Sequence, residues 1–315
     1  MTQAPLRTGP GRSPGSGPDE IRPLPSGPDE IRPLPSGPDE IRPLLAVDGD
    51  SLAHRAFHAL PTTMRDGSGR PANMVVGFAG MVVRLWDAER PRAVFVGWDT
   101  LGVPTYRSGL FPGYQAGRDF PPELTEQLER LPELCGAFGF AWAKAAGYEA
   151  DDFLAAAARS ESARGGRTLV VTSDRDLFQL ASETVTILMP KRGVSELERV
   201  GPAEVRERYG VEPAQVPDFI ALRGDPSDRL PGASGVGPAK AAAVLREHGS
   251  LEAALAAGRF AAEAEALRTY LAIARLQAGA PVPPLPDREP DWARAAELVS
   301  GWGIRALSER LRARA

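Results

Sequence analysis

Acidic residues recur at the points where predicted β-strands end. Asp48 follows the apolar run 44–47, Asp99 follows the run 93–98, and Asp174 comes shortly after the run 168–171. Short apolar runs that end in a polar turn, and that are separated by helical patterns, are typical of parallel strands in an α/β sheet. In such sheets, ligands bind beyond the carboxyl ends of the strands. The pattern therefore predicts an α/β fold with an acidic crevice at one edge of its sheet.

Nine carboxylates are expected to converge on this crevice, because further acidic groups lie between and after the strands. They are Asp48, Asp99, Glu149, Asp151, Asp152, Asp174, Asp176, Asp225 and Asp228. So many like charges would repel each other unless cations lay among them. Each acidic group alone is also compatible with a helix cap or a turn. As a set they predict a site for two or more Mg²⁺ or Mn²⁺ ions, which prefer carboxylate oxygens.

The charge distribution favours a phosphodiester substrate, although the formal net charge of the chain is −4. Outside the nine acids and the N-terminal repeats, Lys and Arg outnumber Asp and Glu. A basic surface around an acidic pocket filled with metal ions suits nucleic acid. No apolar stretch reaches the roughly 18 residues of a membrane span, and the start of the chain lacks the apolar core of a secretory signal.

The single cysteine, Cys135, excludes an internal disulfide and suits a reducing, cytoplasmic location. It lies in an amphipathic helical pattern, so we expect a buried structural thiol rather than a nucleophile. His54 and His58 are one helical turn apart and could in principle bind zinc. We favour packing or phosphate contact for them, because no third nitrogen or sulfur ligand is evident.

Four segments are predicted along the chain. Residues 1–42 are expected to be a disordered, proline-rich tail. The tandem repeat spans residues 16–45, with three ten-residue copies of SGPDEIRPL plus Pro or Leu, and its prolines exclude helix. Residues 43–200 are expected to form the α/β core, and 201–280 a helical subdomain. Residues 281–315 are expected to be a proline-rich linker followed by helix.

The hydrophobic patterns predict individual elements within these segments. Strands are expected at 44–48, 93–99, 168–172 and 185–189, and helices from Ser51, at 72–87, from Pro121 to Phe138, from the acids 149–152 to Gly165, at 202–209, at 213–223 and between Pro238 and Gly249. Residues 100–120 show no clean periodicity. They combine aromatic and basic side chains, including Tyr106, Arg107, Tyr114 and Arg118, as grooves for single-stranded nucleic acid do. A surface loop without function is the alternative.

A glycine-rich turn between two predicted helices is a second candidate binding element. Gly235-Val236-Gly237 precedes Pro238, and Lys240 lies in the first turn of the next helix. The backbone N–H groups of such a turn can approach a phosphate, and its carbonyls can hold a monovalent cation. An ordinary packing corner between helices is the alternative.

Taken together, these motifs resemble the 5′-nuclease superfamily over roughly residues 44–260. The resemblance is strongest to the N-terminal 5′→3′ exonuclease domain of bacterial DNA polymerase I and its stand-alone homologues, relatives of the flap endonucleases. The motifs that carry it are Val47-Asp48-Gly49, Ala56-Phe57-His58-Ala59, Gly147-Tyr148-Glu149-Ala150-Asp151-Asp152, Thr172-Ser173-Asp174-Arg175-Asp176, Gly224-Asp225-Pro226-Ser227-Asp228 and Gly235-Val236-Gly237-Pro238-Ala239-Lys240.

The resemblance implies a PIN-like core with a mostly parallel sheet, a helical arch, and a helix–hairpin–helix-type subdomain that binds duplex DNA and K⁺. It implies that the nine acids are metal ligands and that Arg107 and Arg118 act on the scissile phosphate. Tyr106, Tyr114, Gly235, Gly237 and Lys240 are the implied DNA contacts. The expected substrates are 5′ ends, nicks and flaps in DNA, with RNA primers as a further candidate, and the enzyme is expected to be a monomer.

One departure from the family pattern concerns the arch. The family usually has Tyr-Lys-x-x-Arg there, whereas this chain has Tyr114-Gln115-Ala116-Gly117-Arg118. The missing lysine leaves open a branched-DNA-binding protein that cuts poorly. A PIN-type ribonuclease would share the acidic cage but gives no reason for the glycine-rich turn.

Overall fold

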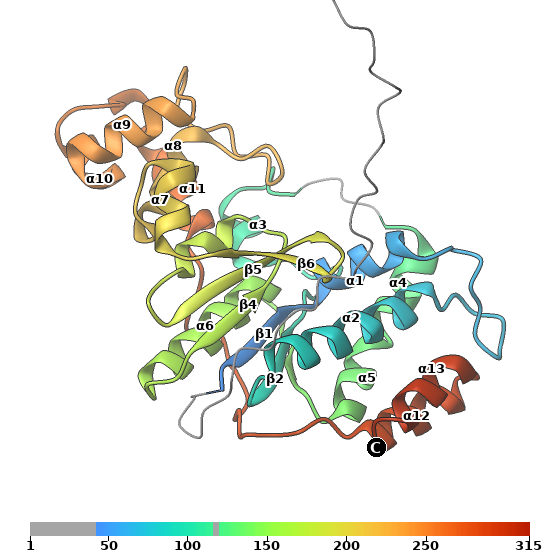
Figure 1. The fold of residues 1–315 in the computed structure, drawn as a ribbon. Coiled ribbons are helices and arrows are strands. Elements are labelled where there is room, and N and C mark those ends of the chain that lie inside the picture. The colour runs from blue at the N-terminus through green and yellow to red at the C-terminus, as the bar shows by residue number, and fades with distance from the viewer. Residues whose placement is uncertain (1–41, 116–119) are drawn as a thin grey trace, which may run out of the picture. The chain divides into compact units, whose positions relative to one another are not determined.

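The fold class predicted from the sequence is confirmed by a computed structural model. The structure describes residues 42–115 and 120–315, which belong to one compact unit, Pro38–Ala315. Residues 1–41, which contain all but the last four residues of the N-terminal repeats, and Arg118 lie outside the described residues. Strands and helices alternate through the first part of this unit, and helices alone form the rest (Figure 1).

A single six-stranded sheet forms the centre, with the strand order β3-β2-β1-β4-β5-β6. Its strands are β1 (Leu44–Asp48), β2 (Ala93–Gly97), β3 (Ala141–Ala143), β4 (Thr168–Val171), β5 (Val185–Arg192) and β6 (Glu196–Val200). The first five strands run parallel and β6 pairs antiparallel with β5. The carboxyl ends of β1, β2 and β4 therefore meet at one edge.

Alternate residues of each central strand pack into two different cores. On β1, Leu44 and Ala46 join a cluster with helix α6 (Ala150–Ala163), whereas Leu45 and Val47 face the opposite side. That side is covered by α1 (Gly49–Ala59), α2 (Asn73–Glu89), α4 (Pro122–Leu128) and α5 (Leu131–Phe138). Strands buried on both faces read as continuous apolar runs, which is why the sequence pattern identified them.

Several elements differ from the sequence prediction. The helix expected from Pro121 to Phe138 is interrupted at Glu129 and Arg130, so that α4 and α5 are separate. A short helix, α3 (Tyr106–Leu110), lies within the segment expected to be irregular. The short edge strand β3 and the polar strand β6 were not predicted, because neither has a run of buried apolar residues.

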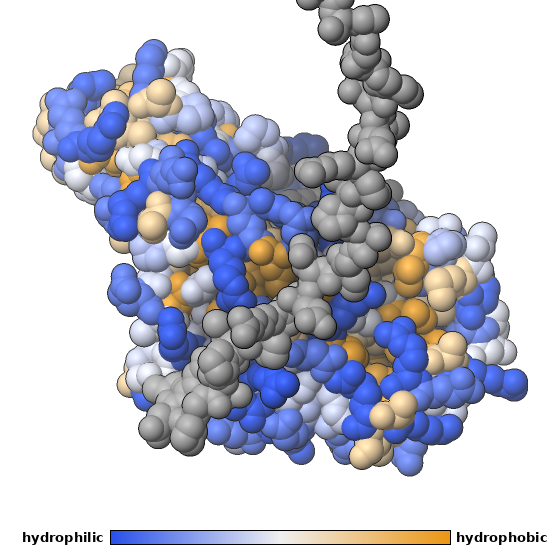
Figure 2. Space-filling view, in the orientation of Figure 1, coloured by the Kyte–Doolittle hydropathy of each residue, from blue (hydrophilic) through white to orange (hydrophobic). Residues whose placement is uncertain are grey.

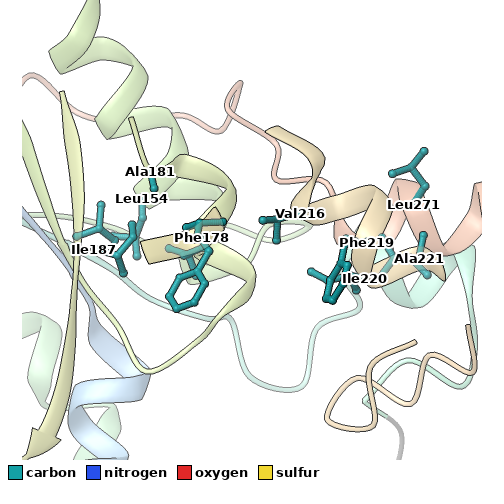
Figure 3. Packing of buried hydrophobic residues seen from close by; sticks show 14 of the residues in the cluster. Leu154, Phe178, Ala181, Ile187, Val216, Phe219, Ile220, Ala221 and Leu271 are labelled. Carbon is teal, nitrogen blue, oxygen red and sulfur yellow. The ribbon is translucent and has the colours of Figure 1, made fainter. Parts of the chain in front are cut away.

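The helical subdomain continues one core of the sheet without a break. It contains α7 (Pro202–Tyr209), α8 (Val216–Arg223), α9 (Pro238–His248), α10 (Leu251–Ala256) and α11 (Ala264–Ala274), with 3₁₀ turns at Pro213–Gln215 and Ala261–Glu263. A further 3₁₀ turn, Asp176–Leu180, lies between β4 and β5. Figure 3 follows this cluster from Leu154 and Ile187 through Phe178 to Phe219 and Leu271. The shared core shows that the helical subdomain packs against one face of the sheet.

The C-terminal segment returns to the other face of the molecule. Helices α12 (Trp292–Gly301) and α13 (Arg305–Arg312) pack on the α2 and α5 side (Figure 1). The extended segment before them is held by buried Arg92, which donates to the Leu285 carbonyl and pairs with Glu161 and Asp287. Cys135 is buried in this core, as expected, and burial raises the pKa of its thiol. Most of the face seen in Figure 2 is hydrophilic.

Gly97 is the point where the sheet sets the position of α6, and it provides a test of the fold. A Cβ atom added to Gly97 would lie 2.6 Å from the carbonyl oxygen of Ala150, the first residue of that helix. We expect Gly97→Ala to destabilise the protein by about 1–3 kcal/mol, as overpacking does. Urea denaturation measures this loss. Gly301→Ala is the control, because nothing lies within 4 Å of its added Cβ and alanine favours helix. Equal stability of the two variants would contradict this packing.

Candidate metal centre

Asp48 lies at the centre of the acidic edge, where the sequence predicted it. As the last residue of β1 it caps α1, and its Oδ1 accepts a hydrogen bond from the Ser51 amide at 2.9 Å. Thr172, directly after β4, donates its hydroxyl to Asp48 Oδ2 at 2.8 Å. Burial raises the pKa of Asp48 to about 7, and the charges of Asp99 and Asp174 add to the rise against these two hydrogen bonds. Asp48, Asp99 and Asp174 therefore interact.

The second acidic group opens helix α6. Asp152 is fully buried; it accepts from the Glu149 amide at 3.1 Å and from the Gln277 amide at 2.8 Å. Burial raises the pKa of Asp151 well above its ordinary value, with Asp152, Glu149 and Asp174 adding to the rise and Arg107 opposing it. Asp151 Oδ1 is buried, and it finds no hydrogen-bond partner within residues 42–115 and 120–315.

Arg107 lies among these carboxylates rather than at the surface. It is 2% exposed, and its guanidinium forms ion pairs with Glu149 at 3.0 Å, Asp151 at 3.1 Å and Asp152 at 2.9 Å. Burial acts to lower its pKa, but the three carboxylates outweigh burial and raise the pKa well above its ordinary value. Arg107 Nε also donates to the Ile273 carbonyl at 3.0 Å. The predicted contact of Arg107 with the scissile phosphate remains a prediction, because this conformation commits the side chain to the acids.

Side chains from the segment 100–120 form hydrogen bonds with Glu149. Thr105 and Tyr114 each donate a hydroxyl to one of its carboxylate oxygens at 2.8 Å. Gln115 Nε2 donates to the Tyr114 hydroxyl at 2.8 Å and to Asp228 Oδ1 at 3.0 Å. The departure seen at position 115 therefore lies beside a predicted metal ligand.

The third acidic group joins the loops after β4 and α8. Burial raises the pKa of Asp176 well above its ordinary value, and Asp174, Asp228 and Asp225 add to the rise. Asp225 shapes its own loop, since it accepts from the Ser227 amide at 2.8 Å and pairs with Arg223 at 3.1 Å. Asp174 interacts with all three groups, because its charge acts on Asp48, Asp151 and Asp176.

The structure thus brings the predicted acids to one edge of the sheet. In the described ranges, no three His, Cys, Asp or Glu side chains are placed so that they could hold a metal ion. Arg107 pairs with Glu149, and Gln115 donates a hydrogen bond to Asp228, so each contacts a carboxylate that the sequence analysis predicts to be a metal ligand. The donor set nevertheless fits a hard divalent cation, because it consists of crowded carboxylates, because burial raises the pKa of Asp48 and Asp151, and because the buried Oδ1 of Asp151 has no hydrogen-bond partner among the described residues.

Of the predicted DNA contacts, the two tyrosines form contacts within the protein, and the two glycines lie at the surface. Tyr114 is buried, and Tyr106 donates its hydroxyl to the Arg275 carbonyl at 2.9 Å while its ring lies 4.7 Å from the Arg107 guanidinium carbon. Gly235 and Gly237 line a surface hollow. Lys240 Nζ donates to the Gly235 carbonyl at 2.8 Å, so this ammonium engages a carbonyl that a monovalent cation would use.

Two residues near the acids were missed by the sequence analysis. Asp50, in the first turn of α1, accepts a hydrogen bond from the Asp99 amide at 2.7 Å. Burial and the charge of Asp99 raise its pKa well above the ordinary value, and the charge of Lys144 opposes the rise. Little in the sequence indicates either residue. An acid in the first turn of a helix, such as Asp50, is common, and Lys144 follows a strand that was not predicted. His54 and His58 pack against Phe120 and Phe57, in agreement with the packing role.

The raised pKa of Asp48 predicts how stability depends on pH without divalent ions. The folded state binds this proton more tightly than the unfolded state, so the free energy of unfolding should fall as pH rises from about 4 to about 7. The pKa values of Asp50, Asp151 and Asp176 are also raised, so these groups should contribute to the same fall in stability. We expect Asp48→Asn to weaken this fall and to raise stability at pH 7, as measured by urea unfolding in EDTA.

Asp66 provides a control, because its pKa is shifted in the opposite direction to that of Asp48. Burial acts to raise its pKa, but the Ser68 and Arg70 amides and two arginines lower it below the ordinary value. Asp66→Asn should therefore lower stability at neutral pH. A flat pH profile for the unchanged protein would rule out strong repulsion at the acidic edge.

Comparison with known proteins places the chain in a family. Residues 43–210 match the model of the 5′-3′ exonuclease N-terminal resolvase-like domain, and residues 211–279 match that of the 5′-3′ exonuclease C-terminal SAM fold. The chain is 44% identical to DNA polymerase I of Mycobacterium leprae over 73% of its own length but only 26% of that protein. It is 36% identical to a 5′-3′ exonuclease of Mycobacterium tuberculosis, over 85% of this chain and 96% of the relative.

Solved structures share the fold at low sequence identity. T5 5′-exonuclease with bound divalent metal ions (zinc) matches with a TM-score of 0.62 at 19% identity, covering 86% of this chain and 97% of that one. The catalytic core of Rad2 in complex with a DNA substrate matches with a TM-score of 0.56 at 16% identity, covering 86% and 92%. Because two adjoining family models span the sheet and the helical subdomain, and a relative matches over nearly its whole length, the chain belongs to the 5′-3′ exonuclease family.

Proposed function

We propose that this chain is a 5′→3′ exonuclease and flap endonuclease that hydrolyses phosphodiester bonds at 5′ ends, flaps or primers. Two or more Mg²⁺ or Mn²⁺ ions would act in the reaction, in DNA replication and repair. The observation that carries the proposal is the convergence of three acidic groups, which interact through Asp174 at the carboxyl edge of the sheet. We also propose that it acts as a monomer in the cytoplasm. Within the described residues, no helix is long and apolar enough to span a membrane.

In this proposal, seven carboxylates are metal ligands and two orient them. Asp48, Asp99, Glu149 and Asp151 would hold one ion, and Asp174, Asp176 and Asp228 the other. Asp152 and Asp225 would orient the ligands or their waters, and the hydrogen bonds that they accept from the amides of Glu149, Gln277 and Ser227 hold them in place for this role. When bound, divalent ions lower the pKa of a coordinated water and stabilise charge on the leaving oxygen.

The remaining side chains would prepare the site before DNA binds. Arg107 neutralises the acids of α6 in this conformation, so it would have to release some of them when ions enter. Tyr114 and Thr105 hold Glu149 at hydrogen-bond distance. Arg118, which lies outside the described residues, remains our candidate for contact with the scissile phosphate.

The helical subdomain would hold the duplex next to the cut. Support comes from Gly235 and Gly237, which line an open hollow, and from Lys240 beside them. Backbone amides of such a turn and a nearby ammonium are suitable phosphate contacts. A K⁺ ion at this turn would require Lys240 to leave the Gly235 carbonyl.

A substrate comparison tests the proposed function. A labelled DNA 5′ flap and a single-stranded RNA are incubated with the protein in Mg²⁺, in Mn²⁺ and in EDTA. We expect cleavage of the flap near its junction in either metal and none in EDTA. Binding of the flap without cleavage would favour a branched-DNA-binding protein, and preferential RNA cleavage would favour a PIN-type ribonuclease.

Asp174 is the acid whose loss should be most informative, because it interacts with all three groups. We expect Asp174→Ala to lower the single-turnover cleavage rate by at least about 100-fold, a typical cost of removing preorganised charge stabilisation. Its circular dichroism spectrum and its binding to the flap in Ca²⁺ should be nearly unchanged. Asp291→Ala, which removes an exposed cap of α12, is the control and should cleave normally. Normal cleavage by Asp174→Ala would exclude the two-ion site.

Gln115 provides a prediction about the arch. Glutamine donates a hydrogen bond to Asp228 but brings no charge. We expect Gln115→Lys to raise the single-turnover cleavage rate, since an ammonium would offset charge that develops on the phosphoryl group, while Gln115→Met should not. Equal rates for the two variants would show that position 115 does not reach the substrate.

A further inference from the structure

Asp50 connects α1 to the end of β2. Its Oδ2 accepts a hydrogen bond from the backbone amide of Asp99 at 2.7 Å. Asp50 lies two residues after the end of β1, and Asp99 lies two residues after the end of the neighbouring parallel strand β2. The hydrogen bond therefore ties together the two chain segments that leave the sheet beside each other.

Asp99 continues the connection to α6. Its Oδ1 accepts a hydrogen bond from the Ala150 amide at 2.7 Å, and Ala150 begins the helix that carries Asp151 and Asp152. Two hydrogen bonds in series, each accepted by a carboxyl oxygen, thus join α1, the loop after β2 and the start of α6.

Close backbone packing keeps these segments within reach of a short side chain. A Cβ atom added to Gly49 would lie 2.5 Å from the Trp98 ring, so α1 rests directly on the residue before Asp99. The amide of Trp98 donates to the Ala143 carbonyl at 3.0 Å, which holds the loop on its other side. In this setting, the direction of the Asp99 side chain depends on where its amide is held.

We propose that Asp50 is a positioning residue, which fixes the Asp99 carboxylate by accepting the Asp99 amide hydrogen bond and so sets the affinity of the centre for divalent ions. The inference rests on the proposed function. Asp50 would act by accepting the hydrogen bond and not by coordinating an ion directly. A neutral acceptor of the same length would then suffice, whereas a longer acid would not.

Three variants separate acceptor position from charge. Asp50→Asn keeps an oxygen at the same reach, Asp50→Glu keeps the charge but moves the oxygen, and Asp50→Ala removes both. Asp291→Ala is the matched control, because the Asp291 carboxylate likewise accepts a backbone amide, that of Arg294 at 2.9 Å, at the start of a helix. Asp291 lies in the C-terminal segment, outside both family models.

Calorimetric titration of the DNA-free protein with Mn²⁺ gives the first readout, and the Mg²⁺ concentration for half-maximal flap cleavage gives the second. We expect Asp50→Ala and Asp50→Glu to weaken Mn²⁺ binding by about 10-fold or more, as loss of a residue that orients a ligand does. Asp50→Asn should stay within about 3-fold of the unchanged protein. Asp291→Ala should be less stable to heat but bind Mn²⁺ normally.

Saturating Mg²⁺ should restore most of the cleavage rate of Asp50→Glu, because the affinity and not the chemical step is affected. Should Asp50→Ala not fold, the comparison of Asp50→Asn with Asp50→Glu decides alone. Equal Mn²⁺ affinity of these two variants would overturn the proposal. A failure of the proposed function differs from this result, since the unchanged protein would then bind no Mn²⁺ or cleave no flap.

Discussion

Repulsion among carboxylates at the carboxyl edge of the sheet is the interaction on which the candidate site depends. Parallel strands β1, β2 and β4 end together, so the acids that follow them are forced into one region. Burial makes their charges costly, as the raised pKa of Asp48 indicates. The chain offsets this cost with backbone amides and hydroxyl groups, and with the buried Arg107.

Arg107 places a positive charge among the acids at the start of α6. Its guanidinium contacts Glu149, Asp151 and Asp152, and its own pKa is raised by them. Removing this arginine would leave three crowded carboxylates without their cationic partner, and the loss of one partner of a buried ion pair is strongly destabilising. In our proposal, divalent ions would have to compete with Arg107 for oxygens of these acids.

The fold was largely predictable because buried strands produce apolar runs and capped helices carry recognisable ends. The predicted strands at 44–48 and 168–172 and the helix between Pro238 and Gly249 agree with the structure within a residue. The short strand β3 and the polar edge strand β6 lack such runs, so pattern alone could not find them. The convergence of the acids followed from sheet topology. The contacts of Asp50 and the burial of Arg107 depend on distances between segments far apart in sequence, which no local pattern contains.

Anomalous diffraction from crystals grown with Mn²⁺ would test the two-ion site most directly. The account predicts two manganese peaks about 3.5–4 Å apart, one within coordination distance of Asp48 and Asp151 and the other of Asp174 and Asp176. It also predicts that Arg107 has released at least one of its acidic partners. A manganese-bound crystal with no peak at this edge, or with Arg107 still paired to all three acids, would contradict it.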